Sequence, residues 1–124
     1  MQDTPDPTEI LNAVATLMRE TIMPLLSGHP NYQVRVAANA LDLVRRQIEL
    51  QPGYDAAEQQ RLTALLGRTG SLEQLNQALC DAIEAHKVTL ETAGLAEHLW
   101  ATTMAKLAVD QPSYARYQRE LTGA

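Results

Sequence analysis

Three helix-start signals, each followed by apolar residues at helical spacing, dominate this sequence of 124 residues. Each is a capping box, in which an Asp or Ser side chain and a Glu or Gln three positions later satisfy free N–H groups at the start of a helix. The pairs are Asp6 with Glu9, Asp55 with Glu58, and Ser71 with Gln74. No stretch alternates apolar and polar residues as a half-buried strand does. The pattern predicts an all-α fold.

Proline and glycine divide the predicted helices. Pro24 lacks a backbone N–H, so we expect the first helix, which begins at Pro7, to bend or stop near residues 21–23. Pro52 and Gly53 should end a second helix over about residues 32–50. Further helices are expected at about residues 55–67, 71–87 and 90–109, followed by a short C-terminal turn. The short connections favour a compact bundle of about five helices with mostly antiparallel neighbours.

Size and composition favour one domain with an aliphatic core. A chain of this length fits a single domain over residues 1–124, with residues 1–6 and 118–124 as flexible termini. Hydrophobic residues make up 45% of the chain, but there is no Phe and only one Trp, so Leu and Ala must fill the core. Cys80 is the only cysteine, which rules out a disulfide framework within the chain and fits a reducing compartment.

Charge and hydropathy narrow the choice of partners. A formal net charge of -5 argues against nucleic acid and against an anionic membrane surface, since both bind through Lys and Arg. No apolar run approaches the roughly 20 residues of a membrane-spanning helix. The first ten residues, MQDTPDPTEI, are acidic and polar, unlike a secretory signal peptide. We therefore expect a cytoplasmic protein that binds neither nucleic acid nor membrane.

The predicted helix 32–50 is apolar on two sides. One side carries Val34, Ala37, Leu41, Val44 and Ile48, and the other carries Val36, Ala40, Leu43 and Leu50. A helix of this kind is usually wedged between neighbours, and its small alanines allow those neighbours to approach closely. We therefore expect this helix to be the central one, with both apolar sides covered.

A narrow polar line interrupts the same helix at Arg35, Asn39, Asp42 and Arg46. It can be a solvent-exposed edge with an Asp42–Arg46 ion pair one helical turn apart. It can instead be structural, with Arg35 and Asn39 donating hydrogen bonds to loop carbonyls or helix ends. The third interpretation is a contact surface for a partner protein or an anionic ligand, because the planar guanidinium suits carboxylate and phosphate.

No candidate for catalysis or metal binding emerges from the remaining residues. His29, His86 and His98 lie in different segments without a second ligand at a helical metal-site spacing, so we expect surface histidines, no metal and no cofactor. The GRTGS stretch at residues 67–71 lacks the Lys-Ser/Thr ending of a phosphate loop and predicts a helix C-cap followed by an N-cap. Cys80, beside Leu79 on a helix, should be a small core or boundary residue.

The last long helix offers a weaker candidate for binding. Lys106 stands there among apolar residues, where a side chain either reaches out to solvent or pairs with an acidic group such as Asp110. Trp100, Tyr114 and Tyr117 make the C-terminal third the most aromatic region. Aromatic and arginine residues are typical of protein interfaces, but also of a tail that packs on its own domain.

Three stretches resemble, in this order, a family of small bacterial proteins of unknown function. They are residues 3–26 (DTPDPTEILNAVATLMRETIMPLL), 35–50 (RVAANALDLVRRQIEL) and 104–117 (MAKLAVDQPSYARY). Members of this family typically occur beside, or joined to, aminoglycoside-phosphotransferase-like kinases and acyl-CoA dehydrogenases. The resemblance implies an accessory subunit of such a kinase, which phosphorylates hydroxyacyl-CoA substrates, as in the breakdown of 4-hydroxy acids such as those derived from levulinate.

The resemblance transfers no catalytic residue, so we expect a binding protein rather than an enzyme. It implies that Arg35, Asn39, Arg46 and Lys106 contact the kinase or its phosphorylated ligand. The alternative is a self-associating helical scaffold or regulator, since the two-sided apolar helix can bury surface against a second copy in a homodimer.

Overall fold

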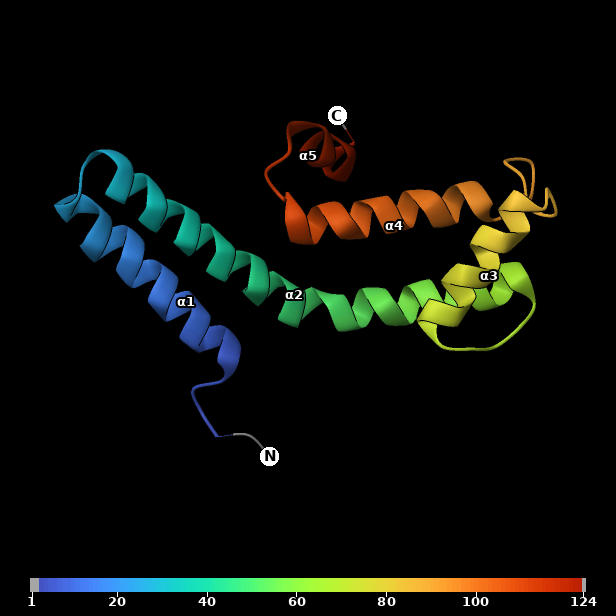
Figure 1. Ribbon diagram of the computed structural model, residues 1–124, viewed down its shortest axis with the longest axis horizontal. Helices are drawn as coiled ribbons and strands as arrows, with labels where there is room; N and C mark the ends of the chain where they lie inside the picture. The colour runs from blue at the N-terminus through green and yellow to red at the C-terminus, as the bar shows by residue number, and fades with distance from the viewer. Residues whose placement is uncertain (1–2, 124) are drawn as a thin grey trace. The chain divides into compact units, whose positions relative to one another are not determined.

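The computed structural model describes residues 3–123, which form helices joined by loops and turns (Figure 1). Within that range the α-helices are α1 (Pro7–Leu17), α2 (Gly28–Leu66), α3 (Leu72–Glu84), α4 (Leu95–Asp110) and α5 (Ala115–Thr122). A π-helical turn, η1 (Met18–Ile22), and a 3-10 turn, η2 (Met23–Leu25), lie between α1 and α2. The described residues contain no strand, which confirms the predicted all-α fold.

The chain divides into two compact units. Unit 1 is Met1–Gln51, and its described part holds α1, η1, η2 and the first part of α2. Unit 2 is Pro52–Ala124, and its described part holds the rest of α2 together with α3, α4 and α5. No helix among the described residues is long and apolar enough to cross a membrane.

The capping box predicted at Asp6 begins α1. The Asp6 carboxylate accepts hydrogen bonds from the backbone N–H of Thr8 at 2.8 Å and of Glu9 at 3.0 Å. The Glu9 carboxylate accepts one in return from the Asp6 N–H at 2.8 Å. The hydroxyl of Thr8, which also donates to Asp6, is the main reason why the pKa of Asp6 is lowered. Residues 1 and 2, part of the predicted flexible terminus 1–6, lie outside the described residues.

Pro24 changes the helix geometry ahead of it, as predicted. The Met23 N–H donates to the carbonyl of Met18, five residues back, so the chain widens into the π-helical η1 after Leu17. Proline has no N–H and its ring collides with the carbonyl four residues earlier, here that of Glu20, so an α-helix cannot continue unchanged through this point. The 3-10 turn η2 then leads to Gly28, where α2 begins.

The predicted break at Pro52 is wrong. Residues 28–66 form one helix with Pro52 inside it, so neither an end near Leu50 nor a new start at Asp55 is present. A proline in a helix removes one hydrogen bond and costs about 3 kcal/mol. The surrounding residues, rich in Gln, Glu, Leu, Arg and Ala, favour helix strongly enough to offset a single local cost.

Unit 2 contains a leucine-rich core. Its buried residues are Leu62, Leu75, Leu79, Val88 and Leu95. The predicted Gly67 C-cap and Ser71–Gln74 capping box are confirmed, and they position α3 against α2. The expected core or boundary position of Cys80 is wrong, because Cys80 is exposed, as is Ile83 on the same helix. Cys80 follows the buried Leu79 by one position, and a step of about 100° turns it away from the core.

The start predicted for the last long helix at residue 90 is also wrong, because α4 begins at Leu95. Thr89 and Thr92 form side-chain hydrogen bonds to backbone N–H groups that hold a turn at residues 89–92. Gly94 then has a φ of 91°, a left-handed conformation that lies outside an α-helix. At the other end, residues 118–122 of the predicted flexible terminus belong to α5, and residue 124 lies outside the described range.

Unit 1 has very little core. Figure 1 shows α1 and the first part of α2 side by side and antiparallel, and Ala15 and Ala38 are the buried apolar residues in this hairpin. Val36, Val44 and Ile48 of α2 are exposed in spite of their apolar side chains. Within unit 1, residues 32–50 therefore pack along one side only, and the expectation that both apolar sides are covered is wrong there.

Candidate functional site

Arg19 of η1 connects the two helices of unit 1. Its guanidinium lies 2.8 Å from the Asn39 side-chain oxygen and 2.7 Å from the Asp42 carboxylate, both on α2. The Arg19 side chain is 37% exposed and that of Asp42 is 19% exposed, so water screens the pair only in part. The polar line on α2 is therefore a contact between helices at Asn39 and Asp42, and neither residue simply faces solvent.

Arg45 lies beside this polar line on α2, 3.9 Å from Asp42 and 3.1 Å from Glu49. Its Nε is buried without a hydrogen-bond partner. Near the start of α2, the Arg35 guanidinium lies 3.4 Å from the Asn31 side-chain oxygen. Asn31 in turn donates to the Met23 and Leu26 carbonyls, which is the structural role that the sequence suggested for Arg35 and Asn39.

The four residues predicted to contact a partner do not form one cluster. Asn39 binds Arg19, Arg35 lies beside Asn31, and Arg46 is half-buried on α2. Lys106 belongs to unit 2, where it is exposed on α4, and no ion pair joins it to Asp110, which the structure also describes. Their role in partner binding stays a prediction. Sequence reasoning missed Arg19, because its partners lie 20 and 23 positions away.

The hairpin of unit 1 is polar on one side and apolar on the other. The Arg19–Asp42 ion pair marks the polar side. Helix geometry, counted at about 100° per residue from the buried Ala15 and Ala38, places a second set of side chains on the opposite side. This set, called here the apolar strip, consists of Ile10, Val14, Val44 and Ile48. Its members are between 38% and 49% exposed.

Unit 2 contains a hollow between the end of α2 and the start of α4, called here the Arg61–His98 hollow. It has a volume of about 270 Å³ and is lined by Arg61, Ala64, Leu65, Ala93, Gly94, Glu97 and His98. The predicted surface position of His98 is wrong, because only 3% of this residue is exposed. Its Nδ1 is buried without a hydrogen-bond partner, and so is the Nε of Arg61.

Burial and charge both act on His98. Desolvation lowers its pKa most, and the positive charge of Arg61 lowers it further, whereas the carboxylate of Glu58 opposes the shift. His98 is therefore neutral at pH 7, with one ring nitrogen able to donate a hydrogen bond and the other able to accept one. The Arg61 guanidinium also reaches the Thr102 hydroxyl, at the long distance of 3.4 Å.

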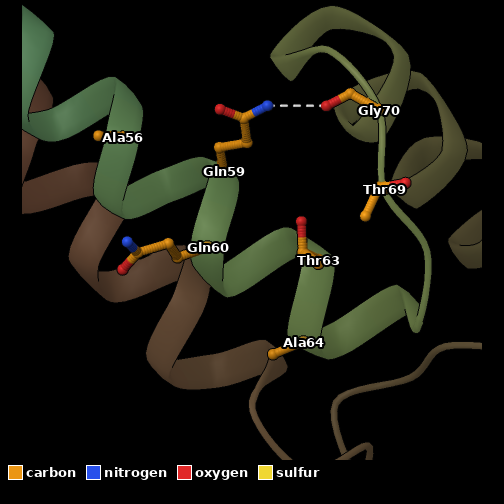
Figure 2. A pocket seen from close by; sticks show the side chains of 7 residues that line it. All are labelled: Ala56, Gln59, Gln60, Thr63, Ala64, Thr69 and Gly70. Carbon is orange, nitrogen blue, oxygen red and sulfur yellow. Dashed lines mark hydrogen bonds between the residues drawn. The ribbon is translucent and has the colours of Figure 1, made fainter.

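A second, more open groove lies between α2 and the loop before α3 (Figure 2). Gln59 points across it and donates a 2.7 Å hydrogen bond to the Gly70 carbonyl, which holds the loop beside the helix. The rest of its lining is Ala56, Gln60, Thr63, Ala64 and Thr69. This groove carries no ionisable side chain, so it offers neither an acid nor a base. Within residues 3–123, no group of three or more His, Cys, Asp or Glu could hold a metal ion.

These features define a small all-α protein. A model of the family described as "Domain of unknown function (DUF6285)" matches residues 24–114, more than half of the chain. The protein therefore belongs to this family of unknown function. No curated protein matches it, and no solved structure matches it either.

Proposed function

We propose that this protein is a non-catalytic accessory subunit that binds a kinase of the aminoglycoside-phosphotransferase-like fold in the cytoplasm. The kinase would act on hydroxyacyl-CoA substrates. Support for the partner comes from the sequence resemblance to small proteins that accompany such kinases. Membership of the DUF6285 family agrees with that resemblance without naming a partner.

The observation that carries a binding role is the apolar strip of unit 1. Isolated exposed apolar residues are normal on a soluble protein, but a contiguous set on one side of a hairpin is typical of an interaction surface. Ile10 and Val14 on α1 and Val44 and Ile48 on α2 remain substantially exposed. Burying such side chains against a partner stabilises a complex by about 25 cal/mol for each Å² removed from water.

The polar side of the same hairpin contributes orientation. Arg19 and Asp42 hold η1 against α2, so the strip residues on the two helices keep a fixed spacing. A partner then meets a preformed surface and loses less entropy on binding than it would with a flexible one. Arg35 and Arg46, the residues predicted for partner contact on α2, belong to the polar side, so any contact that they make with the kinase would be separate from the apolar strip.

Co-expression with the candidate kinase tests the proposal. We expect the two chains to co-elute in size-exclusion chromatography with light scattering, and the kinase to gain yield or activity. Val44→Lys or Ile48→Lys should weaken the complex by about tenfold or more, because a charge is then buried in the contact. Gln47→Lys is the matched control, since it adds the same charge to an exposed position on the same helix.

Three outcomes are informative. Loss of co-elution in the Val44 and Ile48 variants, but not in Gln47→Lys, supports the proposal. A kinase with the same yield, activity and elution volume in both conditions contradicts it. A homodimer that does not bind the kinase, and that dissociates in the Val44→Lys variant, contradicts the accessory-subunit proposal and supports the self-associating alternative.

A further inference from the structure

The Arg61–His98 hollow of unit 2 brings together two side chains that each have an unpartnered nitrogen and the start of a helix that has no side-chain cap. Arg61 contributes a buried, unpartnered Nε, and His98 contributes a buried, unpartnered Nδ1. The start of α4, at Gly94, has no side-chain cap, and Gly94 lines the same hollow. Buried polar groups are almost always hydrogen-bonded in proteins, so two orphaned atoms at the same hollow indicate a place built to receive something.

Arg61 indicates the charge of the occupant. Arg61 is half-buried with its Nε fully buried, and an arginine that is withdrawn from water is usually paired with an anion. Within unit 2, whose described residues are 52–123, no carboxylate lies within 4.0 Å of its guanidinium, and the Thr102 hydroxyl approaches it only to 3.4 Å. A guanidinium prefers a planar anion that can accept two parallel hydrogen bonds, and a carboxylate has that geometry.

His98 and the N-terminal end of α4 also favour a negatively charged ligand. With its proton on Nδ1, neutral His98 donates a hydrogen bond to an anion without bringing a second full charge. The first N–H groups of a helix point out of its N-terminal end, and they and the helix dipole attract negative charge. Arg61 and His98 come from different helices, so these are independent observations about one place.

The other lining residues of the hollow indicate the size and polarity of the rest of the ligand. Ala64, Leu65 and Ala93 make most of the remaining lining apolar. The volume of about 270 Å³ is slightly below the range of about 300–1,000 Å³ that is usual for drug-sized ligands. Glu97 is also part of the lining, and its negative charge disfavours a dianion such as phosphate. A monoanion with a short hydrocarbon chain satisfies all of these conditions.

We propose that the Arg61–His98 hollow binds a small carboxylic acid as its carboxylate, with the carboxylate on Arg61 and His98 beside the start of α4 and the short alkyl chain on Ala64, Leu65 and Ala93. This site is separate from the apolar strip and does not depend on the proposed kinase partner.

Titration of the full-length protein with hexanoate, followed by backbone amide NMR, tests this site directly. We expect saturable shifts at the amides of Gly94, Ala96 and His98. Hexanamide has the same chain without the charge, and inorganic phosphate has the charge without the chain; both should bind at least about tenfold more weakly. Arg61→Met should weaken hexanoate binding by about tenfold or more, whereas Arg68→Met, on an exposed arginine of the same unit, should leave it within about twofold.

Several results would overturn the proposal. They are equal binding of hexanamide, tighter binding of phosphate, equal losses in the two arginine variants, or saturable shifts that fall away from the start of α4. Absence of any saturable shift in the wild-type protein would also overturn it. Because the three ligands can be compared on the wild-type protein alone, the test stands even if Arg61→Met fails to fold.

Discussion

Unit 2 buries large apolar side chains around Leu62, whereas unit 1 buries two alanines and joins its helices through Arg19 and Asp42. Burial of Leu and Val is the main favourable term in folding, so unit 2 has the stronger source of stability. In unit 1, the apolar side chains that could have formed a core remain on its surface. The comparison teaches that the two units use apolar side chains differently: unit 2 buries them in a core, whereas unit 1 leaves many of them exposed.

Truncation in the core of unit 2 should have the largest effect. Leu62 is fully buried, so Leu62→Ala removes its contacts, leaves a cavity and should lower the free energy of unfolding by about 2–5 kcal/mol. Leu17→Ala is the control in unit 1, where the side chain is 51% exposed, and it should cost less than about 1 kcal/mol. Urea denaturation followed by circular dichroism measures both. Equal losses would break the comparison between the units.

Enlarging the contact between the helices of unit 1 should have the next largest effect. Ala38 is fully buried, and Ala38→Leu should force α1 and α2 apart at a cost of about 1–3 kcal/mol. Ala40→Leu adds the same side chain at an exposed position on α2 and should be nearly neutral. Hydrogen exchange of the α1 amides reports the opening. If Ala38→Leu protects α1 as well as the wild type does, the close contact assigned to this alanine is wrong.

Removing the ion pair of unit 1 should have a smaller effect. Arg19→Met leaves Asp42 with Arg45 at 3.9 Å and should cost no more than about 1 kcal/mol, because the pair is partly exposed. The loss should shrink as salt is added, since ions screen such pairs. A double-mutant cycle with Asp42→Asn isolates the interaction between the two side chains. A coupling energy of zero at low salt would mean that the pair does not hold the two helices together.

Acidification should have the most modest effect, and it concerns unit 2. In the folded protein the pKa of His98 lies below its ordinary value of 6.5, which the unfolded chain keeps. As the pH falls, the unfolded chain therefore takes up this proton first. The contribution of neutral His98 to stability is therefore fully present above that value and is lost progressively below it. Urea midpoints at about pH 7.5 and about pH 5.5 should differ less in His98→Gln than in the wild type. An identical pH dependence would contradict this assignment.

Several local signals in the sequence predicted the fold correctly, although the capping box at Asp55 did not. The capping boxes at Asp6 and Ser71 and the helix end at Gly67 depend on residues within a few positions of each other, so the sequence contains all the parties to these contacts. The effect of Pro24 is local in the same way. The prediction at Pro52 was wrong because the residues around it favour helix strongly enough to offset one lost hydrogen bond. A single helix-breaking residue does not show how strongly its neighbours favour helix.

The candidate sites were harder to predict because their contacts are distant in sequence. Arg19 meets Asn39 and Asp42 only after the chain reverses between α1 and α2. Arg61 and His98 line one hollow although 37 positions separate them in the chain, and neither has a neighbour in sequence that marks a site. Burial of His98 follows from the packing of α4 on α2, which periodicity alone does not determine.

Hydrogen exchange of the protein with and without the candidate kinase tests the central claim most directly, because it reports on both units at once. We predict slow exchange in α3 and α4 under both conditions, and new protection in α1 and residues 36–50 when the kinase is present. The claim that unit 1 supplies the binding surface is contradicted if the kinase binds and protects only unit 2, or if the kinase leaves exchange unchanged throughout the chain.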